Sequence, residues 1–350
     1  MVFRPETRVG NLRRTGRPVV CAIGNRLGSR PGILSTVMRV LSALLITLGA
    51  LGPSTAAAQE MPAPAGAEQV APMNPYTSTI SYPLAQDMLM ISVLPDFQSA
   101  RSGRNFVTGM VMLQYGLTSQ WTVGLMVEGQ KIGGLPTTYG GLRVNTYVRL
   151  FPHDDVLHLT LYGEYEGLNG AALYKMEVAG FGGEDLEGPL DEARRTPVRT
   201  FEQRAIMYHD WGRVNLTFNF VSETNLDSHD NDFGYTWGVF RQPRWTGMTS
   251  VAMAAMPGMS ASDAPPLLSL QRLGYGVEML GALGDTHQFG FHRDNQQHYI
   301  GPVFTYAVSP HWSVTLQPAF GLSAVSDPFV LRMGLGTSIE HAVSRLAHSF

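Results

Sequence analysis

The sequence predicts an all-β fold, namely a transmembrane antiparallel up-and-down β-barrel of about twelve strands. Three observations predict it: an export leader, repeated segments that alternate apolar and polar residues, and connections that are alternately short and long. The composition agrees, because the 350 residues are 44% hydrophobic but only 15% charged, against about 25% charged in a typical soluble protein. The low charge and the many aromatic residues also argue against a disordered chain.

Residues 1–58 are typical of a leader that carries a secretory signal peptide. Residues 1–37 hold seven arginines and a single acidic residue, an apolar run follows at 40–51, and Ala56-Ala57-Ala58 supplies small residues for cleavage. The apolar run is shorter than the roughly 20 residues that a membrane-spanning helix needs. A buried core helix is the alternative for this run, and Met38 is an alternative start. The pair Arg13-Arg14 lies too far from the run to favour twin-arginine export.

Removal of the leader changes the charge of the chain. The remaining residues hold 17 basic and 27 acidic side chains, a net charge of −10. This balance gives no basic patch for nucleic acid, so we expect no nucleic-acid partner. The single cysteine, Cys21, leaves with the leader, which excludes disulfides and cysteine metal sites. Residues 59–86 are rich in Pro and Ala and are predicted to form a periplasmic N-terminal tail.

The body of the chain, residues 87–340, is a series of segments with a period of two. Leu142 and Val144 fall on one face of their segment, and Arg143 falls on the other. Such segments of about ten residues suit tilted strands that cross a membrane. The predicted strands are 87–94, 105–116, 121–131, 139–150, 156–166, 199–209, 214–223, 233–241, 270–281, 298–308, 312–322 and 329–339. Their number is even, as in single-chain bacterial barrels; only 199–209 alternates poorly, and 171–181 is expected to add a hairpin inside a loop.

The connections between these segments alternate in length. Short turns are predicted at 117–120, 151–155, 210–213 and 309–311, and longer loops at 132–138, 167–198, 224–232 and 282–297. Outer-membrane barrels have short periplasmic turns and long outer loops. Aromatic residues beside the short turns predict an interfacial girdle: Tyr115, Trp121, Trp211, Tyr306 and Trp312. The segment 242–269 breaks the rule, because it is long although its position predicts a periplasmic turn.

A soluble β-sandwich is the main alternative fold, since its strands also alternate. The export signal and the absence of disulfides favour the membrane barrel, which also leaves no unpaired sheet edge in lipid. We therefore expect the outer membrane of a Gram-negative bacterium, with the lipid bilayer and the barrel insertion machinery as partners. Residues 341–350 are predicted to form a C-terminal tail. It ends in Phe350, the kind of terminal aromatic residue that outer-membrane proteins often carry.

Several segments resemble the meta-pathway phenol-degradation (MetA-type) family of outer-membrane barrels. They are Tyr115–Leu125, Tyr162–Glu166, Asp210–Arg213, Gly301-Pro302, Tyr306–Pro310, Gly321–Ser323 and Ser326-Asp327. These motifs are mostly strand and turn patterns, and the likeness covers most of 87–340 in layout. It implies a barrel that passes hydrophobic or aromatic compounds. The long segments 168–198 and 242–269 depart from the compact pattern of that family.

If the apolar face meets lipid, the polar face lines the lumen, where charged side chains tune the selectivity of a pore. The candidate lumen and selectivity residues are Arg143, Arg149, His158, Tyr162, Glu164, Glu166, Glu223, Glu278 and Arg332. Lys175 joins them if its segment is paired. The alternative for each is a salt-bridge network that only fills the lumen, as in small barrels.

Other chemistry is weakly indicated. His153-Asp154-Asp155, the run 227–232, and the pair His292 and His298 are interpreted as solvated turns or polar loops rather than metal sites. Met248, Met253, Met256 and Met259, with Met61 and Met73, offer thioethers for Cu(I), but methionine is also a common gap filler. Nucleophile-elbow, zinc-protease and phosphate-loop motifs do not occur. We therefore expect no enzyme activity, no cofactor and no metal.

These observations favour a channel or transporter for small compounds, hydrophobic or aromatic ones among them. The first alternative is a structural or surface-interaction barrel that transports nothing. A barrel enzyme or a metal-handling protein is the remaining alternative.

Overall fold

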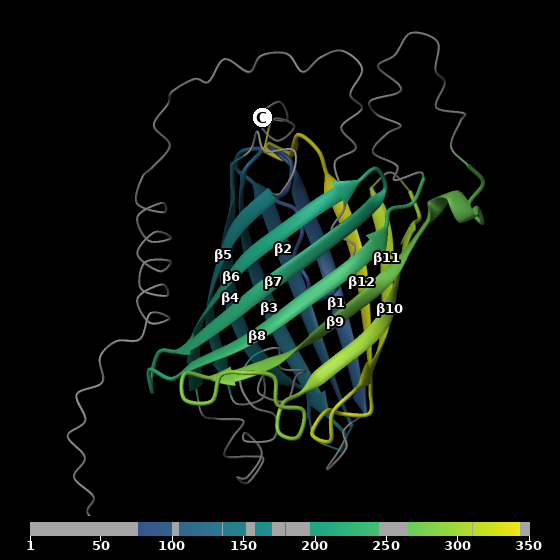
Figure 1. Ribbon diagram of the computed structural model, residues 1–350. Coiled ribbons are helices and arrows are strands. Elements are labelled where there is room, and N and C mark those ends of the chain that lie inside the picture. Colours follow the sequence, from purple (N-terminus) through teal and green to yellow (C-terminus); the bar gives the residue numbers. More distant parts are fainter. Residues whose placement is uncertain are drawn as a thin grey trace, which may run out of the picture. The chain divides into compact units, whose positions relative to one another are not determined.

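The computed structural model describes residues 76–99, 105–134, 136–151, 158–169, 179, 197–244, 265–309 and 311–343 (Figure 1). The predicted leader, the cleavage site, most of the 171–181 hairpin, His153-Asp154-Asp155 and Met248–Met259 lie outside these residues. In the part of the chain that is described, no helix is long and apolar enough to cross a membrane.

The fold is a closed antiparallel barrel in which each strand pairs with its neighbours in sequence and β1 closes the ring against β12. The strands are β1 (Leu89–Ser99), β2 (Phe106–Gly116), β3 (Trp121–Ile132), β4 (Thr138–Leu150), β5 (His158–Asn169), β6 (Pro197–Trp211), β7 (Val214–Asn225), β8 (Asn231–Arg241), β9 (Leu273–Asp285), β10 (His298–Ala307), β11 (Trp312–Gly321) and β12 (Phe329–Ile339). All twelve predicted strands are present, and the predicted up-and-down barrel is confirmed.

The barrel wall is inverted relative to a soluble protein. On β4, Val144 is 49% exposed on the outside, whereas Arg143 and Asn145 on either side of it are buried inside. Leu316 on β11 and Leu335 on β12 point outward in the same way. The period-two pattern therefore separates an apolar outer surface from a polar lumen. In lipid this arrangement is stable because every strand edge is paired with another strand.

Several strand boundaries differ from the prediction by one to five residues, and two of the differences have a local cause. The sequence ends the first strand at residue 94, before Pro95, but β1 continues to Ser99. Proline has no N–H to give to a ladder, and the register between β1 and β12 skips Leu94 and Pro95 before it resumes at Asp96 opposite Arg332. The ninth strand starts at Leu273 instead of residue 270, because Leu270–Arg272 form a short 3-10 helix capped by Ser269.

The short connections β2–β3, β6–β7 and β10–β11 lie at the end of the barrel where β1 begins and β12 ends, as predicted. Trp121 begins β3 and Trp312 begins β11 at this end. At the opposite end the loop after β7 is held by Arg199, whose Nε donates to Asp227 at 3.2 Å. This hydrogen bond holds the pKa of Asp227 below its usual range.

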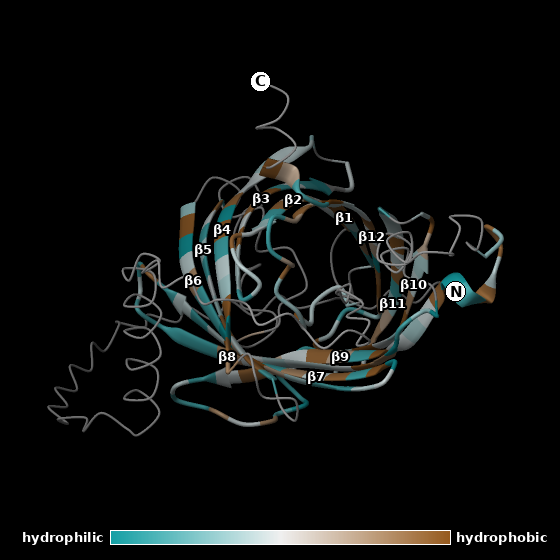
Figure 2. Cartoon of the chain, turned by 90° about the horizontal axis from the view of Figure 1, so that it is seen from above, coloured by the Kyte–Doolittle hydropathy of each residue, from teal (hydrophilic) through white to brown (hydrophobic). Residues whose placement is uncertain are grey.

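The segment before β1 requires a correction. Residues 59–86 were predicted to form a periplasmic tail, but residues 76–84 of that range run inside the barrel (Figure 2). We call residues 76–84 the lumen segment. The physical reason is composition: beyond the Pro and Ala, this stretch carries hydroxyl groups and two tyrosines that match the polar side chains of the inner wall.

Candidate functional site in the barrel lumen

A buried charge cluster lies on the inner faces of β3, β4 and β5. The guanidinium of Arg143 contacts Glu128 at 2.7 Å, Glu164 at 3.2 Å and Glu166 at 2.6 Å. Three neighbouring strands place these side chains together, since Arg143 is opposite Glu166 in the ladder. One cation thus balances three carboxylates, all of them almost fully buried.

Neutral donors complete this cluster. Tyr162 donates its hydroxyl hydrogen to Glu164 at 2.6 Å, and Thr200 donates to Glu166 at 3.0 Å. The amide of Asn145 donates to Glu164 at 3.2 Å. Such bonds to ionised groups are stronger than those between neutral groups, and they fix the positions of the carboxylates.

Two further arginines of the wall, Arg204 and Arg332, each bind both a carboxylate of the wall and the lumen segment. Nε of Arg204 on β6 donates to Glu202 at 2.6 Å, and its Nη1 donates to the backbone oxygen of Ser78 at 2.7 Å. The guanidinium carbon also lies 5.4 Å from the ring centre of Tyr162, within cation–π range. Arg332 on β12 behaves similarly, because it bonds both Asp96 on β1 and the hydroxyl of Ser78.

The carboxylate of Glu278 on β9 holds the lumen segment by its backbone. It accepts hydrogen bonds from the N–H groups of Thr77 at 3.4 Å, Ser78 at 3.0 Å and Thr79 at 2.5 Å, and from the Thr77 hydroxyl at 3.1 Å. A segment without secondary structure must pair its backbone groups when it is buried. Glu278 supplies the acceptor that this stretch of the segment needs.

Side chains of β7 bind the rest of the segment. Asn219 exchanges two hydrogen bonds of 2.9 Å with the backbone of Ile80. The hydroxyls of Ser81 and Thr217 are 2.7 Å apart, and Asn215 accepts from Tyr76 at 2.9 Å. The lumen segment is therefore bound most extensively to β7, with further bonds to β3, β6, β9 and β12.

Aromatic side chains pack where the segment approaches the barrel end. Tyr82 lies edge-on to Tyr208 with ring centres 5.0 Å apart, and its hydroxyl donates to Asp210 at 2.6 Å. The ring of His158 is 4.7 Å from that of Tyr208, and Nδ1 of His158 is 2.7 Å from the Arg149 guanidinium. These large inward residues explain the poor alternation of β6, because Tyr208 and Ile206 are apolar yet point into the lumen.

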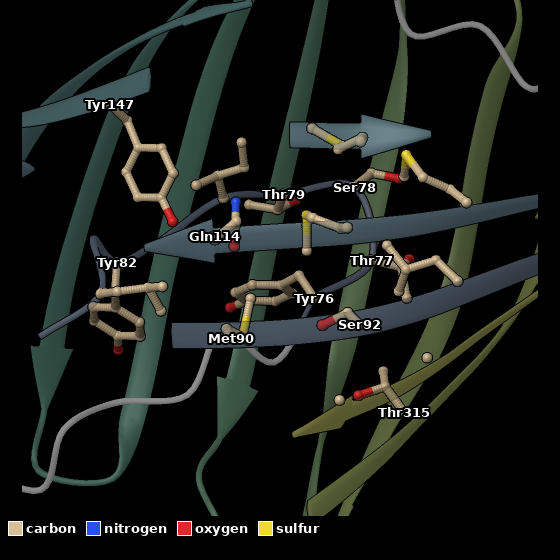
Figure 3. A pocket seen from close by; sticks show the side chains of 18 of the residues that line it. Tyr76, Thr77, Ser78, Thr79, Tyr82, Met90, Ser92, Gln114, Tyr147 and Thr315 are labelled. Atoms are coloured by element: carbon tan, nitrogen blue, oxygen red, sulfur yellow. The ribbon is translucent and has the colours of Figure 1, made fainter. Parts of the chain in front are cut away.

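A cavity of about 690 Å³ remains between the lumen segment and the wall (Figure 3). Tyr76, Ser78 and Thr79 of the segment and Met90 and Gln114 of the wall line it. The segment thus narrows the lumen, and the remaining space is large enough for a small organic molecule.

The cavity lining is acidic. Seven carboxylates and four arginines line it: Asp96, Glu128, Glu164, Glu166, Glu202, Asp210 and Glu223 against Arg143, Arg149, Arg204 and Arg332. The carboxylate of Glu223 makes no hydrogen bond or ion pair with any residue in the described part of the chain. The lumen therefore carries a negative excess, with Glu223 as a carboxylate that is free to meet a solute.

The nine residues predicted for the lumen all lie on the inner side of the wall. Eight of them line the cavity, and Glu278 binds the lumen segment. Their role in selectivity stays a prediction. The sequence places Asn215 and Asn219 on the polar face of their strand, but other inward charged residues were missed, among them Asp96, Glu128, Glu202, Arg204 and Asp210. The alternation of Glu128 with apolar neighbours could have identified it, but no local signal placed residues 76–84 inside the barrel.

The described residues contain no group of three or more His, Cys, Asp or Glu side chains that could hold a metal ion. Within 227–232, Asp227 pairs with Arg199. His298 is buried near Tyr235, and His292 lies in the loop before β10.

Comparisons with known proteins give only distant similarities. No protein-family model and no curated protein matches the chain, so its resemblance to the phenol-degradation family stays a prediction. Among solved structures, an outer-membrane channel from Pseudomonas putida F1 is 9% identical, with a TM-score of 0.48 over 75% of this chain and all of that one. The KdgM porin in complex with disordered oligogalacturonate is 7% identical, with a TM-score of 0.43 over 72% of this chain and 99% of that one. The CymD monoaromatic hydrocarbon channel is 10% identical, with a TM-score of 0.35 over 73% and 90%. Likenesses this distant say nothing about a solute.

The membrane assignment follows from the fold itself. A closed barrel with an even number of antiparallel strands, an apolar outer surface and a polar lumen is the architecture of bacterial outer-membrane proteins. The protein is therefore an outer-membrane barrel of a Gram-negative bacterium.

Proposed function

We propose that the protein is an outer-membrane channel for small solutes, narrowed by its own lumen segment. The observation that carries the proposal is the cavity of about 690 Å³ between residues 76–84 and the inner wall. Polar and charged side chains line it, as in the pores of barrels that pass solutes. The resemblance in sequence adds hydrophobic or aromatic compounds as the solute class.

A structural barrel without transport is the second candidate. The cluster around Arg143 favours it, because paired charges across the lumen are also what a filled barrel interior needs. The two candidates differ in whether ions pass the cavity. Conductance therefore separates them directly.

The test uses the chain without its leader, refolded and inserted into planar bilayers. We expect discrete single-channel currents in potassium chloride. A variant that lacks residues 59–84 should give a larger conductance, since the segment no longer occupies the lumen. Heat-modifiable gel migration verifies that both proteins form the barrel. No current from either folded protein would reject the channel and favour the structural barrel.

A second variant covers the case in which the deletion does not fold. Ser81→Cys with Thr217→Cys replaces two hydroxyls that are 2.7 Å apart, and the chain after the leader has no other cysteine. A disulfide between them would fix the segment to β7. We expect the oxidised form to conduct in a single narrow state. Failure of the two cysteines to form a disulfide in the folded barrel would show that the segment does not lie against β7 and does not narrow the pore.

A further inference from the structure

The cavity has an apolar wall rich in sulfur. Four methionines lie at inward positions of β1, β2 and β3, and all of them line the cavity: Met90, Met110, Met112 and Met126. Met112 is directly opposite Met126 in the ladder, so their side chains are neighbours. Methionine is flexible and polarisable, adapts to irregular apolar shapes and makes favourable contacts with aromatic rings. This wall therefore suits the flat apolar body of a solute.

The methionine wall borders the acidic part of the cavity. Met110 is opposite Glu128 in the ladder between β2 and β3, and Met126 is opposite Arg143. Glu128 is only 4% exposed, and its Oε1 has no hydrogen-bond partner, whereas its Oε2 contacts Arg143. A buried carboxylate oxygen without a partner is costly, and a donor from a solute would relieve that cost. Glu223 offers a second carboxylate in the same cavity.

From this juxtaposition we propose that the cavity binds small organic cations that carry an apolar, preferably aromatic, body. The inference rests on the proposed channel and names its substrate class. The body lies on the methionine wall, and the ammonium group donates hydrogen bonds to Glu128 and Glu223. Organic anions are disfavoured, because seven carboxylates and four arginines line the space. Neutral aromatic solutes gain the apolar contact but not the charge-assisted bonds.

The experiment measures how three probes of one shape interrupt the potassium current of the full channel. The probes are 2-phenylethylammonium, its neutral analogue 2-phenylethanol and the anion phenylacetate, in weakly alkaline buffer so that the carboxylates are ionised. We expect block by the cation, with an apparent affinity about tenfold higher than that of the alcohol, since hydrogen bonds to charged groups exceed neutral ones by that order. Phenylacetate should not block.

Single substitutions test which residues bind the blocking cation. Glu223→Gln removes one charge without breaking an ion pair. It should weaken the apparent affinity of the blocking cation several-fold, because the cation loses one charge-assisted hydrogen bond. Glu128→Gln should act in the same direction. Asp294→Asn removes the same charge from an exposed position in an outer loop, so it should leave the block unchanged. Met112→Ala should weaken block by both the cation and the alcohol, whereas Met112→Leu should retain it.

The outcomes distinguish this inference from the proposed function. If no folded protein conducts, the channel itself is wrong. If the channel conducts but the three probes block equally, or if Glu223→Gln and Glu128→Gln leave block unchanged, the cation site is wrong and the channel stands. If methylammonium blocks as well as 2-phenylethylammonium, the methionine wall does not bind the solute and the inference is overturned.

Discussion

At the residue scale, Arg143 supplies the counter-charge for the buried carboxylates of the lumen. Its guanidinium is the cation shared by Glu128, Glu164 and Glu166, and all four side chains are less than a tenth exposed. Burying an ion pair costs solvation of both partners, so such a cluster adds little stability over apolar packing. Removing the cation alone is different, because it leaves three buried carboxylates without a counter-charge.

We therefore predict that Arg143→Met destabilises the barrel by about 3–5 kcal/mol, the usual cost of breaking a buried pair. Equilibrium unfolding in urea from detergent micelles measures the change. A matched variant combines Arg143→Met with Gln at positions 128, 164 and 166, which removes the charges together and should restore most of the stability. Equal stability of Arg143→Met and the unsubstituted barrel would show that the carboxylates are balanced elsewhere.

At the element scale, the lumen segment depends on a glycine in the wall. A Cβ atom on Gly238 of β8 would lie 2.2 Å from Cε1 of Tyr76, closer than any real contact. The tyrosine ring also packs edge-on against Phe240, with ring centres 5.9 Å apart. The strand thus leaves a space on its inner face that only the absence of a side chain provides.

We predict that Gly238→Val displaces Tyr76 and with it the lumen segment, while valine itself suits a strand. The expected result is a conductance that approaches that of the protein without residues 59–84. The control is Gly109→Val on β2, where a Cβ atom meets nothing within 4 Å. An unchanged conductance for Gly238→Val in a folded barrel would contradict the placement of Tyr76.

At the scale of the whole molecule, the barrel has an inverted distribution of polarity. Val144 in the middle of β4 and Leu335 on β12 face outward, whereas the charges face the lumen. Burial of these apolar side chains in a protein core does not stabilise the barrel, because they face outward into lipid. The closed hydrogen-bonded ring removes every free edge instead.

We predict that Val144→Arg destabilises the barrel by about 2–4 kcal/mol, the cost of arginine on the lipid face near the bilayer midplane. The matched control is Tyr139→Arg on the same strand, which lies near the end of β4 and is 58% exposed. It should cost only about 0–1 kcal/mol, as at an interface. Unfolding in lipid vesicles measures both values, and equal costs at the two positions would argue against a lipid-facing belt.

The sequence by itself determined the wall of the barrel. A period of two is a local property, so the sequence of each strand predicts which residues face lipid and which face the lumen. On β4, Leu142 faces lipid and Arg143 faces the lumen. The turn lengths then fix the order of neighbours, because antiparallel strands joined by short turns must pair. The inward position of the candidates from Arg143 to Arg332 follows from the same alternation, while boundaries such as Ser99 depended on pairing beyond Pro95.

Only the tertiary structure decided what occupies the lumen. Residues 76–84 lack periodicity, and their place is set by distant partners such as Glu278 and Asn219, which are more than 130 positions away in the chain. The partners of the charged side chains could not be predicted either, because they depend on which side chains meet across strands. Arg143 contacts three glutamates, whereas the Glu223 carboxylate has no hydrogen-bond or ion-pair partner among the described residues. Local pattern specifies the face of a strand, but the contents of a pore come from contacts between elements that only barrel closure brings together.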